Sequence, residues 1–193
     1  VAADTPPGGL GSGFVTGFLA DPSNPDAVYM SAFCVYASFD AGANFSYSGN
    51  GLDKGSVHAL VPVPGSPGSY LAATEGVGVQ RTDDDGESWR VANTGVVGQT
   101  LQFASDPTDG DVFFLIAGGH LWKTTDGGET WAPITDNQIS SASVGAIAVA
   151  DYKPHIIYIG MGESSLRGNI MTAEVGYKAT DAGKPWSDGG CRY

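Results

Sequence analysis

The chain has 193 residues, 41% of them hydrophobic, which is enough for one sizeable core or two smaller ones. Nine Lys and Arg against 21 Asp and Glu residues give a formal net charge of −12, which argues against binding to nucleic-acid phosphates or to anionic membranes. No stretch approaches the run of about 18 apolar residues that crosses a bilayer, so we expect no membrane insertion.

Short runs rich in β-branched and aromatic residues follow one another along the chain, each bounded by Gly, Pro, Asp or Asn. None of them continues into a sustained helical period. In chain order the runs predict strands over 13–20, 27–33, 35–39, 44–48, 57–63, 69–74, 78–82, 88–92, 100–105, 111–117, 121–125, 130–134, 144–150, 155–161, 175–180 and 185–187. With 29 glycines for tight turns, the composition is typical of an all-β protein.

One eight-residue pattern recurs four times between these runs, as "SFDAGANF", "TDDDGESW", "TTDGGETW" and "ATDAGKPW". Each copy, called an aspartate turn below, has an aspartate, a glycine and a final aromatic anchor. The fourth copy has Ala179 where the others have Ser or Thr. The aspartates are Asp40, Asp84, Asp126 and Asp181, and the anchors are Phe45, Trp89, Trp131 and Trp186.

The anchors recur at intervals of about 40 to 55 residues, and four predicted strands fall within each interval. A unit of that length with four strands is typical of a propeller blade. We therefore predict a single β-propeller domain over 1–193, built of four-stranded antiparallel blades at about 12–50, 55–95, 99–136 and 143–189. The longer last interval is explained by an insertion, 162–174, between the second and third strands of the fourth blade.

The recurrence of the aspartate turns favours a structural role over a catalytic one. The aspartate can accept hydrogen bonds from backbone N–H groups of its own turn, and glycine supplies a backbone angle that other residues resist. The aromatic residue returns to the sheet and packs there. We therefore do not propose these aspartates as catalysts.

The repeated pattern resembles the Asp-box, or BNR repeat, of sialidase-type propellers. Residues 118–186 resemble bacterial sortilin-like, glycosyl-hydrolase-like BNR proteins, and "GSGFVTGFLADPSNPDAVYM" resembles the opening blade of xyloglucan-cleaving Asp-box glycoside hydrolases. These resemblances imply a larger, exported propeller with more than four blades. The motif occurs in enzymes and in binding proteins alike, so it implies fold better than activity.

In a propeller the aspartate turns occupy one end of the blades, and ligand sites usually lie at the other end, where the second strand runs into the third. There the sequence offers Glu75 in "TEGVG" and Glu163 in "GMGESS". The xyloglucan-cleaving resemblance implies a catalytic acid at the place of Glu75. A glycosidase needs two carboxyl groups roughly 5 to 9.5 Å apart. Glu75 and Glu163 are therefore the candidate acid–base pair, and the alternative is that both are turn or rim residues.

The insertion also supplies polar candidates for ligand binding: Ser164, Arg167 and Asn169. Arg167 either binds a carboxylate or a sugar hydroxyl, or pairs with Glu163 and orders the loop. Sialidase activity is disfavoured because it needs a cluster of arginines. The anchors use three of the four tryptophans, so Phe33, or else Tyr36, is the candidate for stacking on a sugar ring.

We expect no metal or cofactor. The histidines fall in unrelated parts of their blades, which argues against a zinc site. The run Asp83–Asp85 offers either a calcium site or, as we favour, a solvated turn. Cys34 and Cys191 either form one disulfide across neighbouring blades of a closed ring or remain free thiols.

Three functional hypotheses follow. The first is a non-catalytic, extracytoplasmic or secreted propeller module for recognition or assembly, with a glycan or a protein as its partner. The second is a glycoside hydrolase, or a fragment of one, that acts on polysaccharide through paired carboxylates. The third is a structural protein that self-associates through open blade edges.

Overall fold

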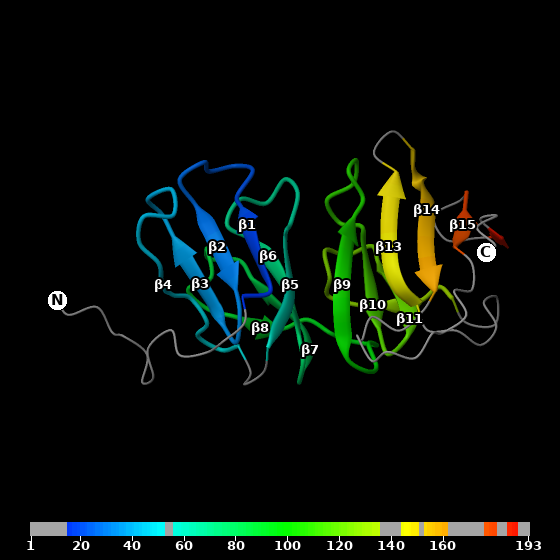
Figure 1. The fold of residues 1–193 in the computed structure, drawn as a ribbon, viewed down its shortest axis with the longest axis horizontal. Coiled ribbons are helices and arrows are strands. Elements are labelled where there is room, and N and C mark those ends of the chain that lie inside the picture. Colours follow the sequence, from blue (N-terminus) through cyan, green and yellow to red (C-terminus); the bar gives the residue numbers. More distant parts are fainter. Residues whose placement is uncertain are drawn as a thin grey trace. The chain divides into compact units, whose positions relative to one another are not determined.

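The computed structural model describes residues 15–52, 56–135, 144–150, 153–161, 176–180 and 185–188. Within these residues sixteen strands form four antiparallel, four-stranded sheets, and no helix is present (Figure 1). No helix long and apolar enough to span a membrane therefore occurs in this part of the chain.

Each sheet takes its four strands in chain order, so that every strand pairs with the next one along the sequence. Sheet 1 contains β1 (Gly17–Ala20), β2 (Val28–Ser31), β3 (Val35–Ser38) and β4 (Ser46–Tyr47), and sheet 2 contains β5 (Val57–Pro62), β6 (Tyr70–Thr74), β7 (Gly78–Thr82) and β8 (Arg90–Val91). Sheet 3 contains β9 (Thr100–Ser105), β10 (Phe113–Ala117), β11 (His120–Thr124) and β12 (Ala132–Pro133). Sheet 4 contains β13 (Val144–Ala150), β14 (Lys153–Met161), β15 (Tyr177–Ala179) and β16 (Trp186–Asp188). Every predicted strand has its counterpart here.

The chain divides into two compact units, Val1–Ala92 and Asn93–Tyr193, each holding two sheets. That the whole chain is one domain stays a prediction. Within the first unit β5 lies against β1 and β2, and within the second β13 lies against β9 and β10. In both units the first strand of the later sheet therefore lies against the first two strands of the earlier sheet.

The two units have cores of different chemistry. The first core combines small residues with aromatic ones: Ala27, Tyr29, Val35, Ala37, Val57, Tyr70, Ala72 and Trp89. The second is almost entirely aliphatic: Val112, Phe114, Ile116, Leu121, Val144, Ile147, Ile157 and Ile159. Burial of these side chains supplies the main favourable free energy that holds each pair of sheets together.

The mixed core of the first unit includes a buried hydrogen-bonded network that sequence reasoning missed. The Tyr70 hydroxyl donates to Asp21 Oδ2 at 2.7 Å, and the rings of Tyr29 and Tyr70 lie 4.4 Å apart. Burial raises the pKa of Tyr29 to about 12, and it raises the pKa of Tyr70 further. Both tyrosines are therefore neutral donors at physiological pH, and Asp21 is the acceptor that satisfies Tyr70.

Three aspartate turns, on the hairpins β3–β4, β7–β8 and β11–β12, have the same hydrogen-bond pattern. In the second, the Thr82 hydroxyl donates to Asp84 Oδ1 at 2.7 Å and accepts from the Gly86 amide at 3.0 Å. Ser88 donates to the same carboxylate from its amide at 2.9 Å and from its hydroxyl at 2.5 Å. The equivalent bonds recur around Asp40 and Asp126. These carboxylates hold the turn closed, and Asp181 of the fourth copy lies outside the described residues.

The glycine of each turn is required by its backbone angle. Gly42, Gly86 and Gly128 have φ values of 86°, 84° and 95°, in the left-handed region that favours glycine. At Gly86 there is a second reason, because a Cβ there would lie 2.3 Å from Ser48 Oγ of the neighbouring sheet. Gly86 thus allows both the turn and the close approach of sheets 1 and 2.

The anchors differ in what they contact. The Trp89 indole donates to the Ser48 carbonyl of sheet 1 at 2.7 Å, and the Trp186 indole donates to the Ile134 carbonyl that follows sheet 3 at 3.2 Å. The Trp131 indole instead donates to Gly128 of its own turn at 3.0 Å. Phe45, the anchor of sheet 1, remains 37% exposed and meets the Phe18 ring edge-on at 6.5 Å. Trp89 and Trp131 are thus buried, at 6% and 5% exposed, whereas Phe45 and Trp186 are only partly covered.

Candidate functional site

The end of each sheet opposite the aspartate turns is called the connection end here, because the second strand runs into the third at this end. In sheet 1 the connection is 32–34, and in sheet 2 it is 75–77. The Val57 amide donates to the Ala32 carbonyl at 2.9 Å, and the Glu75 amide donates to the Ser56 carbonyl at 3.0 Å. Because Ser56 and Val57 are adjacent, these two bonds bring both connections to the start of β5. The first unit thus presents Phe33 and Glu75 at one end.

Glu75 begins the tight connection between β6 and β7, and its side chain is exposed. Its backbone amide is used in the bond to Ser56, which fixes the place at which the carboxylate leaves the sheet. A carboxylate presented in this way can accept hydrogen bonds from sugar hydroxyls or transfer a proton to a glycosidic oxygen. Its predicted partner, Glu163, lies outside the described residues.

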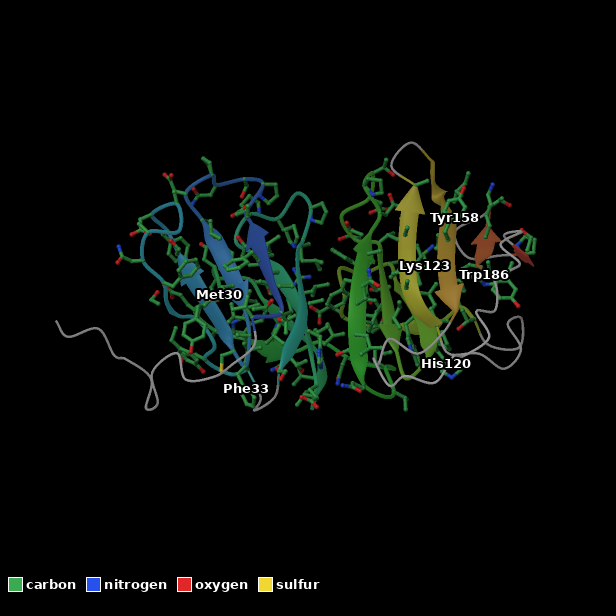
Figure 2. The ribbon with its side chains drawn as sticks, viewed as in Figure 1. Met30, Phe33, His120, Lys123, Tyr158 and Trp186 are labelled. Atoms are coloured by element: carbon green, nitrogen blue, oxygen red, sulfur yellow. The ribbon has the colours of Figure 1, made fainter. Side chains whose placement is uncertain are left out.

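Phe33 is 66% exposed at the connection end of sheet 1 (Figure 2). The next residue, Cys34, is half-buried and contacts Tyr47 at the end of β4. Burial and this contact raise the pKa of the Tyr47 hydroxyl, which donates to the Gly49 carbonyl at 3.0 Å. The connection end of sheet 1 therefore offers an exposed aromatic face beside a fixed tyrosine, and sequence reasoning had missed Tyr47.

The corresponding connection in sheet 3 is Gly118–Gly119, which offers backbone but no side chain. The Gly118 amide donates to Gln99 and the Gly119 carbonyl accepts from Val144, both at 3.0 Å. A Cβ at Gly98 would lie 2.5 Å from the Gly118 Cα. The two connecting segments of the backbone therefore approach each other so closely that only glycine fits at position 98. His120 follows this connection and is exposed.

The acidic run Asp83–Asp85 lies at the turn end of sheet 2, and its three carboxylates have different surroundings. Asp83 pairs with Arg81 at 2.7 Å and with Arg90 at 3.3 Å, and the hydrogen bond from Arg81 is the chief reason that the pKa of Asp83 is lowered. Asp84 closes its turn, and Asp85 has a left-handed backbone. Among the described residues no three His, Cys, Asp or Glu side chains are grouped to hold a metal. The prediction of a solvated turn rather than a calcium site at this run stays a prediction.

The remaining predicted site residues lie outside the part of the chain that the structure describes. These are Glu163, Ser164, Arg167 and Asn169 of the insertion, and Cys191, the predicted partner of Cys34. The acid–base pair, the polar ligand set and the disulfide therefore all stay predictions. What the structure brings together is Glu75 and Phe33, through the backbone bonds at Ser56 and Val57.

No protein-family model matches the chain. A curated relative, a xyloglucanase from Paenibacillus sp, is 24% identical over 93% of this chain, which spans 21% of that protein. The chain therefore corresponds to about a fifth of the length of this relative.

Comparison with solved structures supports the propeller fold. The enzyme GH74 from Niastella koreensis has a TM-score of 0.71 at 19% identity, covering 90% of this chain and 30% of its own. The GH74 xyloglucanase from Xanthomonas campestris has a TM-score of 0.70 at 18% identity, with 89% and 29% covered. YCF48 bound to D1 peptide has a TM-score of 0.60 at 18% identity, with 86% and 50% covered. The prediction of an all-β propeller built of four-stranded antiparallel blades is confirmed.

Proposed function

We propose that this chain is a segment of an extracytoplasmic, glycan-acting β-propeller of the glycoside hydrolase class. The observation that carries the proposal is the similarity to a xyloglucanase over 93% of the chain. The resemblance of the opening stretch, residues 11–30, to xyloglucan-cleaving glycoside hydrolases supports the same class. The substrate class that follows is a neutral β-glucan such as xyloglucan, and a neutral polysaccharide suits a chain whose net charge is −12.

In this proposal the connection end of the first unit contacts the polysaccharide. The exposed ring of Phe33 stacks on the apolar face of a sugar, and the Glu75 carboxylate serves as one of the two acids that glycoside hydrolysis requires. One acid protonates the glycosidic oxygen while the other acts as nucleophile or activates water. Glu163 is the proposed second acid within this chain.

The test is release of reducing sugars from xyloglucan by the 193-residue chain, with mannan as a comparison polysaccharide. We expect Glu75→Gln to lower the rate by roughly 10²- to 10⁴-fold, the usual contribution of a general acid or base. Glu87→Gln is the matched control, since Glu87 is an exposed glutamate of the same sheet at the turn end. Absence of both hydrolysis and xyloglucan binding would overturn the proposal.

A second candidate is a non-catalytic recognition module, and the observation in its favour is the likeness to YCF48, which is recorded bound to a peptide. The two candidate functions predict different effects of the Glu75→Gln substitution. If the chain only binds, it retains xyloglucan or a protein ligand without releasing sugar. Glu75→Gln then affects binding alone, as Phe33→Ala does. Affinity electrophoresis in xyloglucan gels, run beside the hydrolysis assay, distinguishes them.

A further inference from the structure

The first aspartate turn differs from the next two in the residue that directly precedes its aromatic anchor. That residue is Asn44, and Phe45 and Ser46 follow it. Asn, any residue but Pro, then Ser or Thr is the triplet at which secreted proteins accept an N-linked glycan. No other asparagine has Ser or Thr two residues after it: Asn24, Asn50, Asn93, Asn137 and Asn169. Such triplets also occur by chance, so accessibility in the folded chain is the deciding property.

Asn44 is exposed on the hairpin between β3 and β4 (Figure 1). Its equivalents in the second and third turns, Ser88 and Thr130, are exposed as well. They stay exposed although the anchors that follow them, Trp89 and Trp131, are buried at 6% and 5%. Burial of an anchor therefore does not bury the residue before it. Asn44 is accessible whether or not a further blade covers sheet 1.

The hydrogen bonds of Asn44 are compatible with a substituent on its side-chain nitrogen. Its backbone amide donates to Asp40 Oδ1 at 2.8 Å, and Nδ2 donates to Asp40 Oδ2 at 2.8 Å. Nδ2 has two hydrogens, and this bond uses one of them. A sugar replaces one hydrogen and leaves the other for Asp40, so a glycosylated Asn44 can still close the turn.

The equivalent hydroxyls lack this second hydrogen. Ser88 Oγ and Thr130 Oγ1 each have a single hydrogen and donate it to the aspartate of their own turn. Of the three residue types at this place, asparagine alone can carry a substituent and keep donating to the aspartate. The first turn thus combines an acceptor triplet, an exposed side chain and a nitrogen with a hydrogen to exchange.

We propose that Asn44 is an N-glycosylation site. The co-substrate is an oligosaccharide linked to a polyprenyl diphosphate. The bond from Asn44 Nδ2 to C1 of the first sugar forms, and the bond from C1 to the diphosphate oxygen breaks. The diphosphate leaves with the electron pair, Nδ2 loses one proton, and nothing is oxidised or reduced. The proposal rests on the extracytoplasmic location that is part of the proposed function.

The glycan would lie at the turn end of sheet 1, whereas Phe33 lies at the connection end of the same sheet and Glu75 at that of sheet 2. An N-linked glycan is bulky and solubilising, and it suits a surface that the ligand does not use. The modified chain should therefore bind and hydrolyse xyloglucan as the bare chain does.

The experiment is the intact mass of the chain expressed with a secretion signal in yeast, recovered from the medium or the microsomal fraction, before and after treatment with peptide N-glycanase. The expected mass exceeds that of the polypeptide by one oligosaccharide, which the enzyme removes. Asn44→Gln and Ser46→Ala should each lack the oligosaccharide. Ser46→Ala keeps both bonds from Asn44 to Asp40, so it separates loss of the acceptor from loss of the turn. Ser46→Thr is the matched control and should keep the glycan.

A wild-type chain with the mass of the bare polypeptide overturns the proposal, and so does an oligosaccharide that persists in Asn44→Gln or in Ser46→Ala. Release of reducing sugars from xyloglucan is measured on the same samples. A glycosylated chain without xyloglucan hydrolysis or binding contradicts the proposed function alone, and a bare chain that hydrolyses xyloglucan contradicts glycosylation alone.

Discussion

At one end of sheet 2 the Asp84 carboxylate receives hydrogen bonds from Thr82 and Ser88, and at the other end of the same sheet the Glu75 carboxylate is exposed. The same contrast holds in sheet 1, where Asp40 closes a turn and Phe33 is open to solvent. Polar groups at the turn end are used by the fold, whereas side chains at the connection end are available to a ligand. Substitutions at the two ends should therefore affect different measurements.

The largest effect on stability is expected at the anchor Trp89. Trp89→Ala removes a buried indole and leaves the Ser48 carbonyl without its donor, so the free energy of unfolding should fall by about 3–5 kcal/mol. Urea denaturation measures the change. Val91→Ala, two residues along at a 54% exposed position, is the control and should stay within about 0.5 kcal/mol. A loss below about 1 kcal/mol at Trp89 would contradict the role of the anchor.

A smaller loss is expected when an aspartate turn loses its carboxylate. Asp84→Ala removes the acceptor of the Thr82 and Ser88 hydrogen bonds, and should lower the free energy of unfolding by about 1–3 kcal/mol. Glu75→Gln at the connection end should change it by less than about 0.5 kcal/mol. Equal losses for the two substitutions in urea titrations would remove the distinction between the ends.

The aspartate turns also predict how stability depends on pH. Hydrogen bonds from the Asn44 side chain and backbone, and from Ser38, lower the pKa of Asp40 to about 2, and bonds led by that from the Ser88 side chain lower the pKa of Asp84. The ordinary value in an unfolded chain is about 3.9. The stabilisation is therefore present above about pH 4 and is lost as the pH falls towards 2. The urea midpoint of unfolding should therefore decrease between about pH 4 and pH 2, and Asp40→Asn should make that decrease smaller. A midpoint that stays constant from about pH 5 to pH 2 would contradict this prediction.

The smallest effect is a gain at Ala41, which has a left-handed backbone with φ of 56°. The equivalent place in the third turn is Gly127, with φ of 68°. Ala41→Gly should raise the free energy of unfolding by about 0.5–1 kcal/mol, since the steric cost of alanine there exceeds the extra chain entropy of glycine. Ala43→Gly in the same turn is the control and should give no gain in thermal denaturation.

The strands and the turn chemistry could be predicted because both depend on local sequence. Short runs of β-branched and aromatic residues bounded by Gly, Pro, Asp or Asn indicate a strand, and the Thr–Asp–Gly spacing indicates a closed hairpin, whatever lies around them. The same local logic placed Phe33 and Glu75 at one end, since each follows the second strand of its sheet.

The burial of the anchors could not be predicted, because the eight-residue motif does not specify what packs against its aromatic residue. Phe45 and Trp89 occupy the same motif position, yet one is 37% and the other 6% exposed. The bond between Tyr70 and Asp21 has no local signal either, since it joins a strand of sheet 2 to the turn that follows β1. The spacing of Glu75 and Glu163 is likewise a long-range property, and it stays a prediction.

The most direct test of the contrast between the two ends is the affinity for xyloglucan per folded molecule, measured by isothermal titration calorimetry on wild type, Asp84→Ala and Phe33→Ala. We predict that Asp84→Ala lowers stability but keeps the dissociation constant within about twofold, whereas Phe33→Ala keeps stability and weakens binding roughly tenfold, about 1.4 kcal/mol. A loss of affinity at Asp84 as large as that at Phe33 would contradict the account.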